Sequence, residues 1–230
     1  KSGKFIILTI LFLISQSFST LFNTLTLERL IMPSDSTPAL ILASSSKYRK
    51  ELLSRLGFPF TTISPDIDES PLPGEKPQGT ALRLAFLKAK AVGLQHPGSI
   101  VIGSDQVAEC RDEQIGKPGS FEKAFEQLKK MRGREVNFHT ALCVWNGKDA
   151  DPDKTAQKDI VKTVVTFRDL PDEELQAYLK IEEPYDCAGS AKNEALGIAI
   201  LEKIESSDPT ALTGLPLIAL TTMLRNCGLS

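Results

Sequence analysis

Short apolar runs alternate with amphipathic helical stretches along most of the chain, and this alternation constrains the fold more than any other feature. Residues 38–43 (PALILA) and 99–103 (SIVIG) have the length and composition of buried strands. The first run leads through three serines into residues 47–57 (KYRKELLSRLG), where Ser46 can cap a helix and Gly57 can end it. Strands interleaved with helices predict an α/β fold.

The middle of the chain indicates that the sheet is mixed rather than purely parallel. Residues 135–145 alternate as a half-buried strand does, Asn146 and Gly147 supply a turn, and residues 159–167 return as a second strand. We expect this pair to be a hairpin, with residues 148–158 as an exposed polar excursion. Further strands are predicted at 60–64 and 197–204, and helices at 80–94, 120–131, 171–180 and 216–226.

Composition excludes several classes of protein. The 230 residues carry a formal net charge of -2, so no overall basic field exists to hold a nucleic acid. The four cysteines show neither a CxxC motif nor zinc spacing, which argues against a disulfide framework and a structural metal site. We therefore predict a cytoplasmic protein with no nucleic-acid partner.

The amino terminus differs in composition from the rest of the chain. Residues 5–14 (FIILTILFLI) are almost entirely apolar, yet this run is too short for a membrane span, which needs about 20 residues. The segment imitates a secretory signal, so it is either a targeting or anchoring segment or translated upstream sequence ahead of Met32. We expect the second. Residues 1–36 are then an extension outside the fold, residues 37–230 are one domain, and no membrane is contacted unless the segment is genuine.

A first candidate site is the serine-rich turn that enters the first helix. Backbone N–H groups and the positive end of the helix dipole favour an anion at such a place. Ser44 and Ser46 add hydroxyl donors, and Arg49 adds positive charge. The turn lacks the glycines of a P-loop, so a capped helix with solvated basic residues is the alternative.

Carboxylates form the second candidate. An acidic run, residues 66–69, follows one predicted strand, and Asp105 stands at the predicted carboxyl end of another. Carboxylates that face one crevice at strand ends can hold Mg²⁺ or Mn²⁺, because these ions prefer oxygen ligands. Glu69 and Asp105 are our candidate metal ligands. A solvated acidic loop beside a turn-forming aspartate is the alternative.

Three lysines near predicted element ends form the third candidate group, namely Lys88, Lys117 and Lys192. Charge neutralisation is the main contribution that a protein makes to phosphoryl transfer. Taken singly, each lysine reads as an exposed side chain that aids solubility. Together with Arg49 they could spread along a triphosphate.

Taken in order, these segments resemble the Maf family of nucleoside triphosphate pyrophosphatases. The resemblance extends from about Ala39 to Leu224, and its motifs are LASSSKYRKELL (42–53), DIDES (66–70), LRLAFLKAKA (82–91), IGSDQV (102–107), GKP (116–118), CAGSAKNEALG (187–197) and GLPLIAL (214–220). It implies an elongated mixed α/β sheet flanked by helices, with two lobes around a deep cleft. It also implies metal-dependent hydrolysis of a small-molecule nucleoside triphosphate between the α and β phosphates, which yields the monophosphate and pyrophosphate.

The resemblance also assigns roles to matching positions. Asp105 corresponds to the family's catalytic proton acceptor, and Tyr48, Gln106 and Glu194 correspond to its specificity positions. These residues look like the subgroup that acts on 7-methyl-GTP rather than the one that acts on dTTP and UTP. Lys47 departs from the family's usual proline, although it adds positive charge.

Elementary chemistry agrees with that subgroup. Methylation at N7 gives guanine a delocalised positive charge, which an aromatic face and a carboxylate both attract. Tyr48 and Glu194 supply these two groups, unless Tyr48 is merely the first apolar residue of its helix. The alternatives are a dTTP or UTP pyrophosphatase, a nucleotide-binding regulator without turnover, and a membrane-tethered interaction protein. The oligomeric state stays open, with a homodimer as one alternative.

Overall fold

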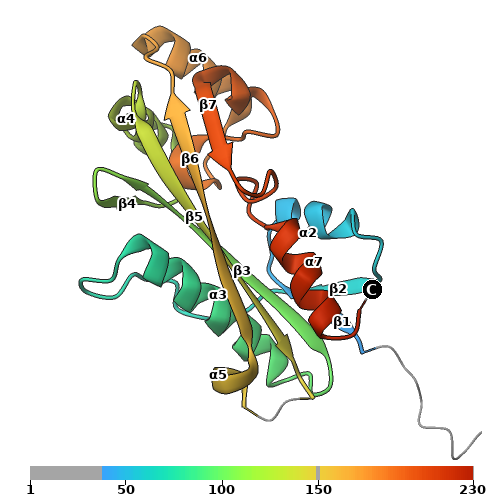
Figure 1. Ribbon diagram of the computed structural model, residues 1–230. Coiled ribbons are helices and arrows are strands. Elements are labelled where there is room, and N and C mark those ends of the chain that lie inside the picture. The colour runs from blue at the N-terminus through green and yellow to red at the C-terminus, as the bar shows by residue number, and fades with distance from the viewer. Residues whose placement is uncertain (1–37, 149–150, 230) are drawn as a thin grey trace, which may run out of the picture. The chain divides into compact units, whose positions relative to one another are not determined.

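A computed structural model describes residues 38–148 and 151–229 (Figure 1). The predicted extension, residues 1–36, lies outside the described residues, so the domain boundary stays a prediction. The residues from Pro38 on form one compact unit. Within the described ranges, no helix is both long and apolar enough to cross a membrane.

The described strands form one mixed sheet of seven strands, in the order β2-β1-β3-β5-β6-β7 with β4 paired to β3. β1 pairs in parallel with β2 and β3, whereas β3, β5, β6 and β7 pair antiparallel in turn. The predicted mixed sheet and its hairpin are therefore confirmed. The strands are β1 (Leu40–Ala43), β2 (Phe60–Ile63), β3 (Ile100–Cys110), β4 (Glu113–Ile115), β5 (Glu135–Asn146), β6 (Gln157–Phe167) and β7 (Leu201–Ser206).

The helices begin and end near the predicted signals. Ser46 caps the first of them, because its side chain accepts a hydrogen bond from the Arg49 N–H at 3.4 Å. Gly57 follows with a φ of +75°, which favours glycine. The helices are α2 (Lys47–Ser54), α3 (Pro77–Gly93), α4 (Phe121–Met131), α5 (Pro152–Thr155), α6 (Asp172–Glu182) and α7 (Leu217–Asn226), with short 3-10 turns at η1 (Ala188–Ser190) and η2 (Leu196–Ile200).

Two strand predictions are wrong in part. β3 continues to Cys110, so Asp105 lies in the middle of a strand rather than at its carboxyl end. The reason is that the residues after Asp105 stay in register with β5 and are largely buried. Residues 197–200 form a 3-10 turn instead of a strand, because the chain there folds back against Lys192. A Cβ atom at Gly197 would lie only 2.6 Å from the Lys192 backbone nitrogen.

Two further details differ from the sequence expectation. The segment 148–158 contains the short helix α5 and the first residues of β6, so its described part is not an irregular excursion throughout. β5 is buried on both faces, not on one as its alternation predicted. Helices cover both faces of the sheet at this point, and a strand between two such layers has no solvated side.

The core divides into clusters that share the long strands. On one face of the sheet α3 packs with Ala81, Ala85 and Ala89, while α2 and α7 cover the opposite face (Figure 1). A further cluster packs α4 and α6 against the far ends of β3 and β5. The compact unit therefore has two lobes on one continuous sheet, as the resemblance implied.

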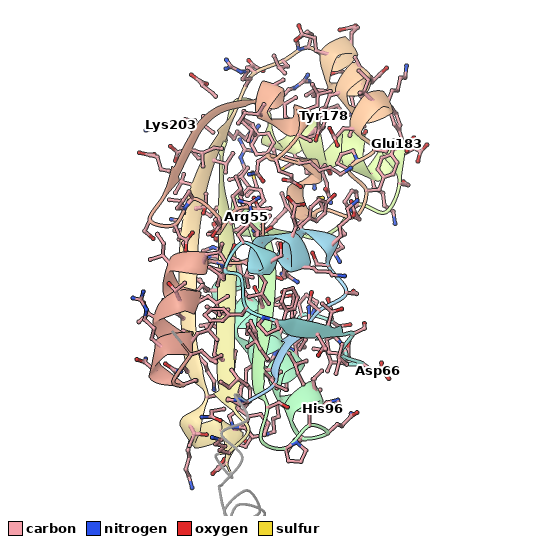
Figure 2. The ribbon with its side chains drawn as sticks, turned by 90° about the vertical axis from the view of Figure 1, so that its right-hand side faces the viewer. Arg55, Asp66, His96, Tyr178, Glu183 and Lys203 are labelled. Carbon is pink, nitrogen blue, oxygen red and sulfur yellow. The ribbon has the colours of Figure 1, made fainter. Side chains whose placement is uncertain are left out.

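Figure 2 shows the two lobes from the side. Tyr178 and Glu183 lie in the lobe that carries α4 and α6, while Asp66 and His96 lie toward the opposite end of the sheet. Residues of β3 and β5 belong to the clusters of both lobes. The long strands therefore run through both lobes.

A glycine lets α3 approach the sheet. A Cβ atom at Gly103, in β3, would collide with the carbonyl oxygen of Ala85 and would lie 2.8 Å from the backbone nitrogen of Ala89. Only glycine leaves room for this contact. This close packing sets the distance between α3 and β3. It therefore also determines which β3 residues the α3 side chains can contact.

Candidate active site

The site begins at a gap in the sheet along one edge of β3. On that edge β1 pairs with residues 100–102 and β4 pairs with residues 108–110. Among the described strands, none pairs with residues 103–107 on this edge. The residues that follow β1 and β2 lead into the gap, and the carboxyl ends of parallel strands are where open α/β sheets bind ligands. A cleft of about 650 Å³ opens there.

The cleft collects side chains from segments that are far apart in the sequence. Because adjacent strand residues point to opposite faces, Asp105 reaches the cleft from the α3 face and Gln106 from the other. Of the residues predicted for the site, those that line the cleft are Ser44, Ser46, Tyr48, Arg49, Glu69, Lys88, Asp105, Gln106, Lys117 and Glu194. In the sequence these residues could be grouped only by residue type. The structure places them in one cleft.

Lys192 is the predicted residue that the cleft lining does not include. Its ammonium donates a hydrogen bond to the Glu182 carbonyl at 2.7 Å and lies 3.2 Å from the Glu182 carboxylate. The Lys192 side chain is 13% exposed, so these contacts are shielded from solvent. Lys192 therefore ties its loop to the end of α6, and its placement on the phosphates stays a prediction.

Lys88 lies at the centre of the charged part of the cleft. Its Nζ atom donates to Asp105 Oδ1 at 2.6 Å and lies 2.9 Å from Glu69 Oε1. The side chains of Lys88 and Asp105 are 6% and 10% exposed, so each needs a partner of opposite charge. Lys88 thus bridges the two predicted metal ligands and fixes the orientation of the Asp105 carboxylate.

Arg49 forms the opposite wall. Its Nε atom donates to the Gly214 carbonyl at 2.8 Å, and its Nη1 atom donates to Ser44 Oγ at 3.4 Å. Burial lowers the pKa of Arg49, while the nearby carboxylates of Asp105 and Glu69 oppose that shift. An arginine stays charged under such conditions. The guanidinium is therefore a fixed positive group beside the serine-rich turn.

The segment 212–214 forms another wall, and its sequence did not indicate a role for Leu212 or Thr213. Gln106 Nε2 donates to the carbonyls of Ala211 at 3.1 Å and Leu212 at 3.0 Å. Ser104 Oγ lies 2.9 Å from the Gly214 carbonyl. The amide nitrogen of Gln106, a predicted specificity residue, thus holds this wall in place. The motif that begins at Gly214 was the signal that pointed here.

The cleft lining also includes Tyr48 and Glu194. Burial, followed by the nearby Cys187 and Asp186, raises the pKa of the Tyr48 phenol, so this group stays neutral. Burial also raises the pKa of Glu194, and Lys192 opposes that shift. The Lys47 ammonium lies over the Tyr48 ring, 4.9 Å from its centroid.

The charged cluster also bears on the predicted metal. Among the described residues, no group of three or more histidine, cysteine or acidic side chains is arranged to hold a metal ion. Glu69 and Asp105 nevertheless converge on one nitrogen atom, that of Lys88. Mg²⁺ is commonly bound by one or two carboxylates together with substrate phosphates. In this arrangement the Lys88 ammonium lies between the two carboxylates, and a metal at Glu69 and Asp105 stays a prediction.

Glu75 joins the loop that carries Glu69 to α3. Its carboxylate accepts hydrogen bonds from Arg83 Nε and Nη2, both at 2.8 Å, and from Thr80 Oγ1 at 2.9 Å. These contacts, chiefly those of Arg83, lower the pKa of Glu75 to about 2. Thr80 lines the cleft, so the hydrogen bonds of Glu75 support the edge of the cleft.

The lowered pKa predicts how stability depends on pH. Ionised Glu75 should stabilise the fold above its ordinary pKa of 4.5, and this contribution should fade as the pH falls toward about 2. Glu75→Gln should therefore lower the free energy of unfolding at pH 7, with a difference that shrinks on acidification. Urea unfolding followed by circular dichroism measures it. Glu51→Gln, at an exposed ion pair with Arg55, is the control. A difference that stays constant from pH 7 to 2 would contradict the assignment.

Comparison with known proteins decides the family. The family model described as Maf-like protein matches residues 39–227. The chain belongs to the Maf family. Among curated relatives of this Maf protein, a 7-methyl-GTP pyrophosphatase of Cupriavidus metallidurans is 60% identical over 197 residues, which is 86% of this chain and 97% of the relative.

Another relative agrees with this result. A 7-methyl-GTP pyrophosphatase of Bordetella pertussis is 60% identical to the Maf protein over 192 residues, which is 84% of this chain and 94% of the relative. Among solved structures, the Staphylococcus aureus Ham1 protein is 18% identical, with a TM-score of 0.39, and the match covers 57% of this chain and 72% of that one. That similarity is too low to support a functional argument.

Proposed function

We propose that this Maf protein hydrolyses a nucleoside triphosphate between the α and β phosphates, and that 7-methyl-GTP is its preferred substrate. The observation that carries the proposal is the convergence of Arg49, Lys88 and Lys117 with Asp105 and Glu69 in one cleft. Such a set of cations beside carboxylates suits a polyphosphate and an attacking water. The names of the relatives support the same reaction.

Asp105 is the group that we assign to accept the proton of the attacking water. Lys88 occupies its Oδ1 atom, and among the described residues no hydrogen bond reaches Oδ2. The water oxygen would form a bond to the α-phosphorus as the bond from that phosphorus to the bridging oxygen breaks. Asp105 would take the water proton, and pyrophosphate would leave. Arg49 and Lys117 would stabilise the charge that develops on the phosphates.

We further propose that a divalent metal, Mg²⁺ or Mn²⁺, binds with the nucleotide at Glu69 and Asp105. When bound, such an ion polarises a phosphoryl oxygen. Glu69, whose side chain is 52% exposed, can move toward a ligand without leaving a buried charge unpaired. Lys88 balances the two carboxylates in the absence of the ion, which favours joint entry of metal and triphosphate.

The base would lie against Tyr48 and Glu194. A 7-methylguanine ring carries positive charge, so it gains from the face of Tyr48 and from the carboxylate of Glu194. Unmethylated guanine has nearly the same outline and lacks the charge. A preference for the methylated base would therefore reflect electrostatics more than shape.

A panel of nucleotides tests the proposed reaction. The full chain is incubated with 7-methyl-GTP, GTP, dTTP and UTP, with Mg²⁺, Mn²⁺ or EDTA, and pyrophosphate release is measured. We expect the highest kcat/KM for 7-methyl-GTP and no turnover in EDTA. Higher values for dTTP or UTP would favour the pyrimidine alternative, and binding without turnover would favour a regulator.

Glu194→Gln tests base recognition. Because it removes a negative charge opposite a cationic base, kcat/KM for 7-methyl-GTP should fall about tenfold or more, while that for GTP should fall much less. Glu202→Gln is a matched control, because Glu202 is exposed on β7 and outside the cleft. Equal losses on both nucleotides would remove Glu194 from base recognition.

A cytoplasmic location and a homodimer remain proposals. Cys110, Cys143 and Cys187 form no disulfide in the described ranges, as expected in a reducing compartment. Cell fractionation tests the location, and light scattering of the purified chain tests the oligomeric state.

A further inference from the structure

Gln127, on α4, connects two loops that line the cleft from different parts of the chain. Its Nε2 atom donates to the Gly116 carbonyl at 3.0 Å, and its Oε1 atom accepts from Ser190 Oγ at 2.7 Å. Gly116 immediately precedes Lys117, which we place on the phosphates. Ser190 belongs to the segment 187–194, which ends at Glu194. Gln127 itself does not line the cleft.

The loop around Ser190 needs such an anchor. Ser190 is buried and has a φ of +53°, a conformation that serine rarely adopts, and the preceding Gly189 has a φ of +71°. Backbone of this kind persists only where its surroundings hold it. The Tyr178 hydroxyl donates to the Ser190 carbonyl at 3.1 Å, and Gln127 holds the Ser190 side chain.

An amide suits this place. Glutamine donates to the Gly116 carbonyl and accepts from the Ser190 hydroxyl through one planar group. A glutamate would keep the acceptor and turn a repulsive oxygen toward the Gly116 carbonyl. A second link, from the Gly119 N–H to the Tyr185 carbonyl at 3.1 Å, joins the neighbouring chain segments through backbone alone. Loss of Gln127 should therefore loosen the loops without separating them.

We propose that Gln127 is a positioning residue, which holds the loop of Lys117 and the loop of Glu194 at the spacing that a triphosphate and its base require. This inference rests on the proposed function. It assigns to Gln127 a role in substrate selection that acts through Glu194 and Lys117, without contact to the substrate.

Three substitutions test the two hydrogen bonds of Gln127 separately. Gln127→Leu removes both, Gln127→Glu removes the donor to Gly116, and Ser190→Gly removes the hydroxyl while it accommodates the positive φ. Lys123→Ala, an exposed position one turn earlier on α4, is the matched control. For each variant kcat/KM is measured for 7-methyl-GTP and for GTP, and the ratio of the two values is compared with that of the parent.

We expect Gln127→Leu to lower the preference for 7-methyl-GTP about five- to tenfold, the loss expected for a hydrogen bond. Ser190→Gly should lower it similarly, Gln127→Glu should raise KM for both nucleotides, and Lys123→Ala should change neither. Combined with Glu194→Gln, Gln127→Leu should cause no further loss of preference, because its effect on the preference between the two bases acts through Glu194. An unchanged preference in Gln127→Leu, or strictly additive losses in the double variant, would overturn the proposal.

A separate measurement distinguishes failure of this inference from failure of the proposed function. Amide hydrogen exchange of residues 187–194 does not depend on turnover. Gln127→Leu should accelerate this exchange about tenfold, whatever the substrate is, since this segment loses one hydrogen bond, that of Ser190 to Gln127. Unchanged exchange would overturn the proposal even in an active enzyme. Faster exchange in a chain that hydrolyses no nucleotide would instead count against the proposed function alone.

Discussion

Asp105→Asn should reduce turnover of 7-methyl-GTP by about 10³-fold or more, a loss typical of a missing general base together with a missing charge. The amide cannot accept the proton of the attacking water at neutral pH. It nearly matches the carboxylate in shape, and Lys88 keeps Glu69 as a charged partner, so the fold should remain. Nucleotide affinity measured in EDTA should stay within a few-fold of the parent, because Arg49 and Lys117 are unchanged and no metal contributes under that condition. Steady-state kinetics and equilibrium binding of the same variant measure the two quantities.

The control for this substitution is Asp159→Asn. Asp159 is an exposed aspartate on β6 outside the cleft lining, so the turnover of this variant should match that of the parent. Near-normal turnover in Asp105→Asn would refute the assigned role. A parallel collapse of turnover and of thermal stability would show that the pair with Lys88 serves the fold rather than the reaction.

Gly103→Ala should be the most damaging single-atom addition in this part of the sheet. The new Cβ atom would collide with the Ala85 carbonyl, so α3 must move away from β3. Overpacking of this kind costs about 1–3 kcal/mol of stability. The movement would also pull Lys88 away from Asp105, and displacement of a positioned group by about 1 Å can reduce turnover roughly 10²-fold. Thermal unfolding and steady-state kinetics give both numbers.

Gly79→Ala is the matched control for that prediction. Gly79 lies in α3 itself, but a Cβ atom there meets only the Glu75 side chain, at an ordinary 3.5 Å. Since alanine favours a helix over glycine by about 1 kcal/mol, the variant should be as stable as the parent or more so. If Gly103→Ala behaves in the same way, the close approach of α3 does not set the geometry of the site.

Much of the fold was predictable because its signals are local. Ser46 caps α2 as expected, and the hairpin of β5 and β6 follows the turn at Asn146 and Gly147. The predicted end of β3 was wrong because it also relied on local signals alone. The polar residues from Ser104 to Gln106 look like a strand end when read locally, whereas pairing with β5 continues through them.

Most residues that line the cleft were also predictable, but the contacts that each side chain makes were not. Lys88 and Lys192 look alike in the sequence, as basic residues near the ends of elements. The fold buries Lys88 between Glu69 and Asp105 and turns Lys192 toward Glu182. Gln127 carried no signal, because a glutamine on a helix reads as an exposed polar residue.

The sequence by itself determined the order of strands and helices, the residue types available for phosphate chemistry and the family, since these depend on neighbouring residues and on motifs. Only the tertiary structure decided which charges meet. Arg49 and Gly214 are 165 residues apart in the chain and bonded in the fold. Such contacts depend on the gap left beside β3 and on the close packing of α3 at Gly103. A buried charge must find its partner in space, and the distance along the chain does not restrict that choice.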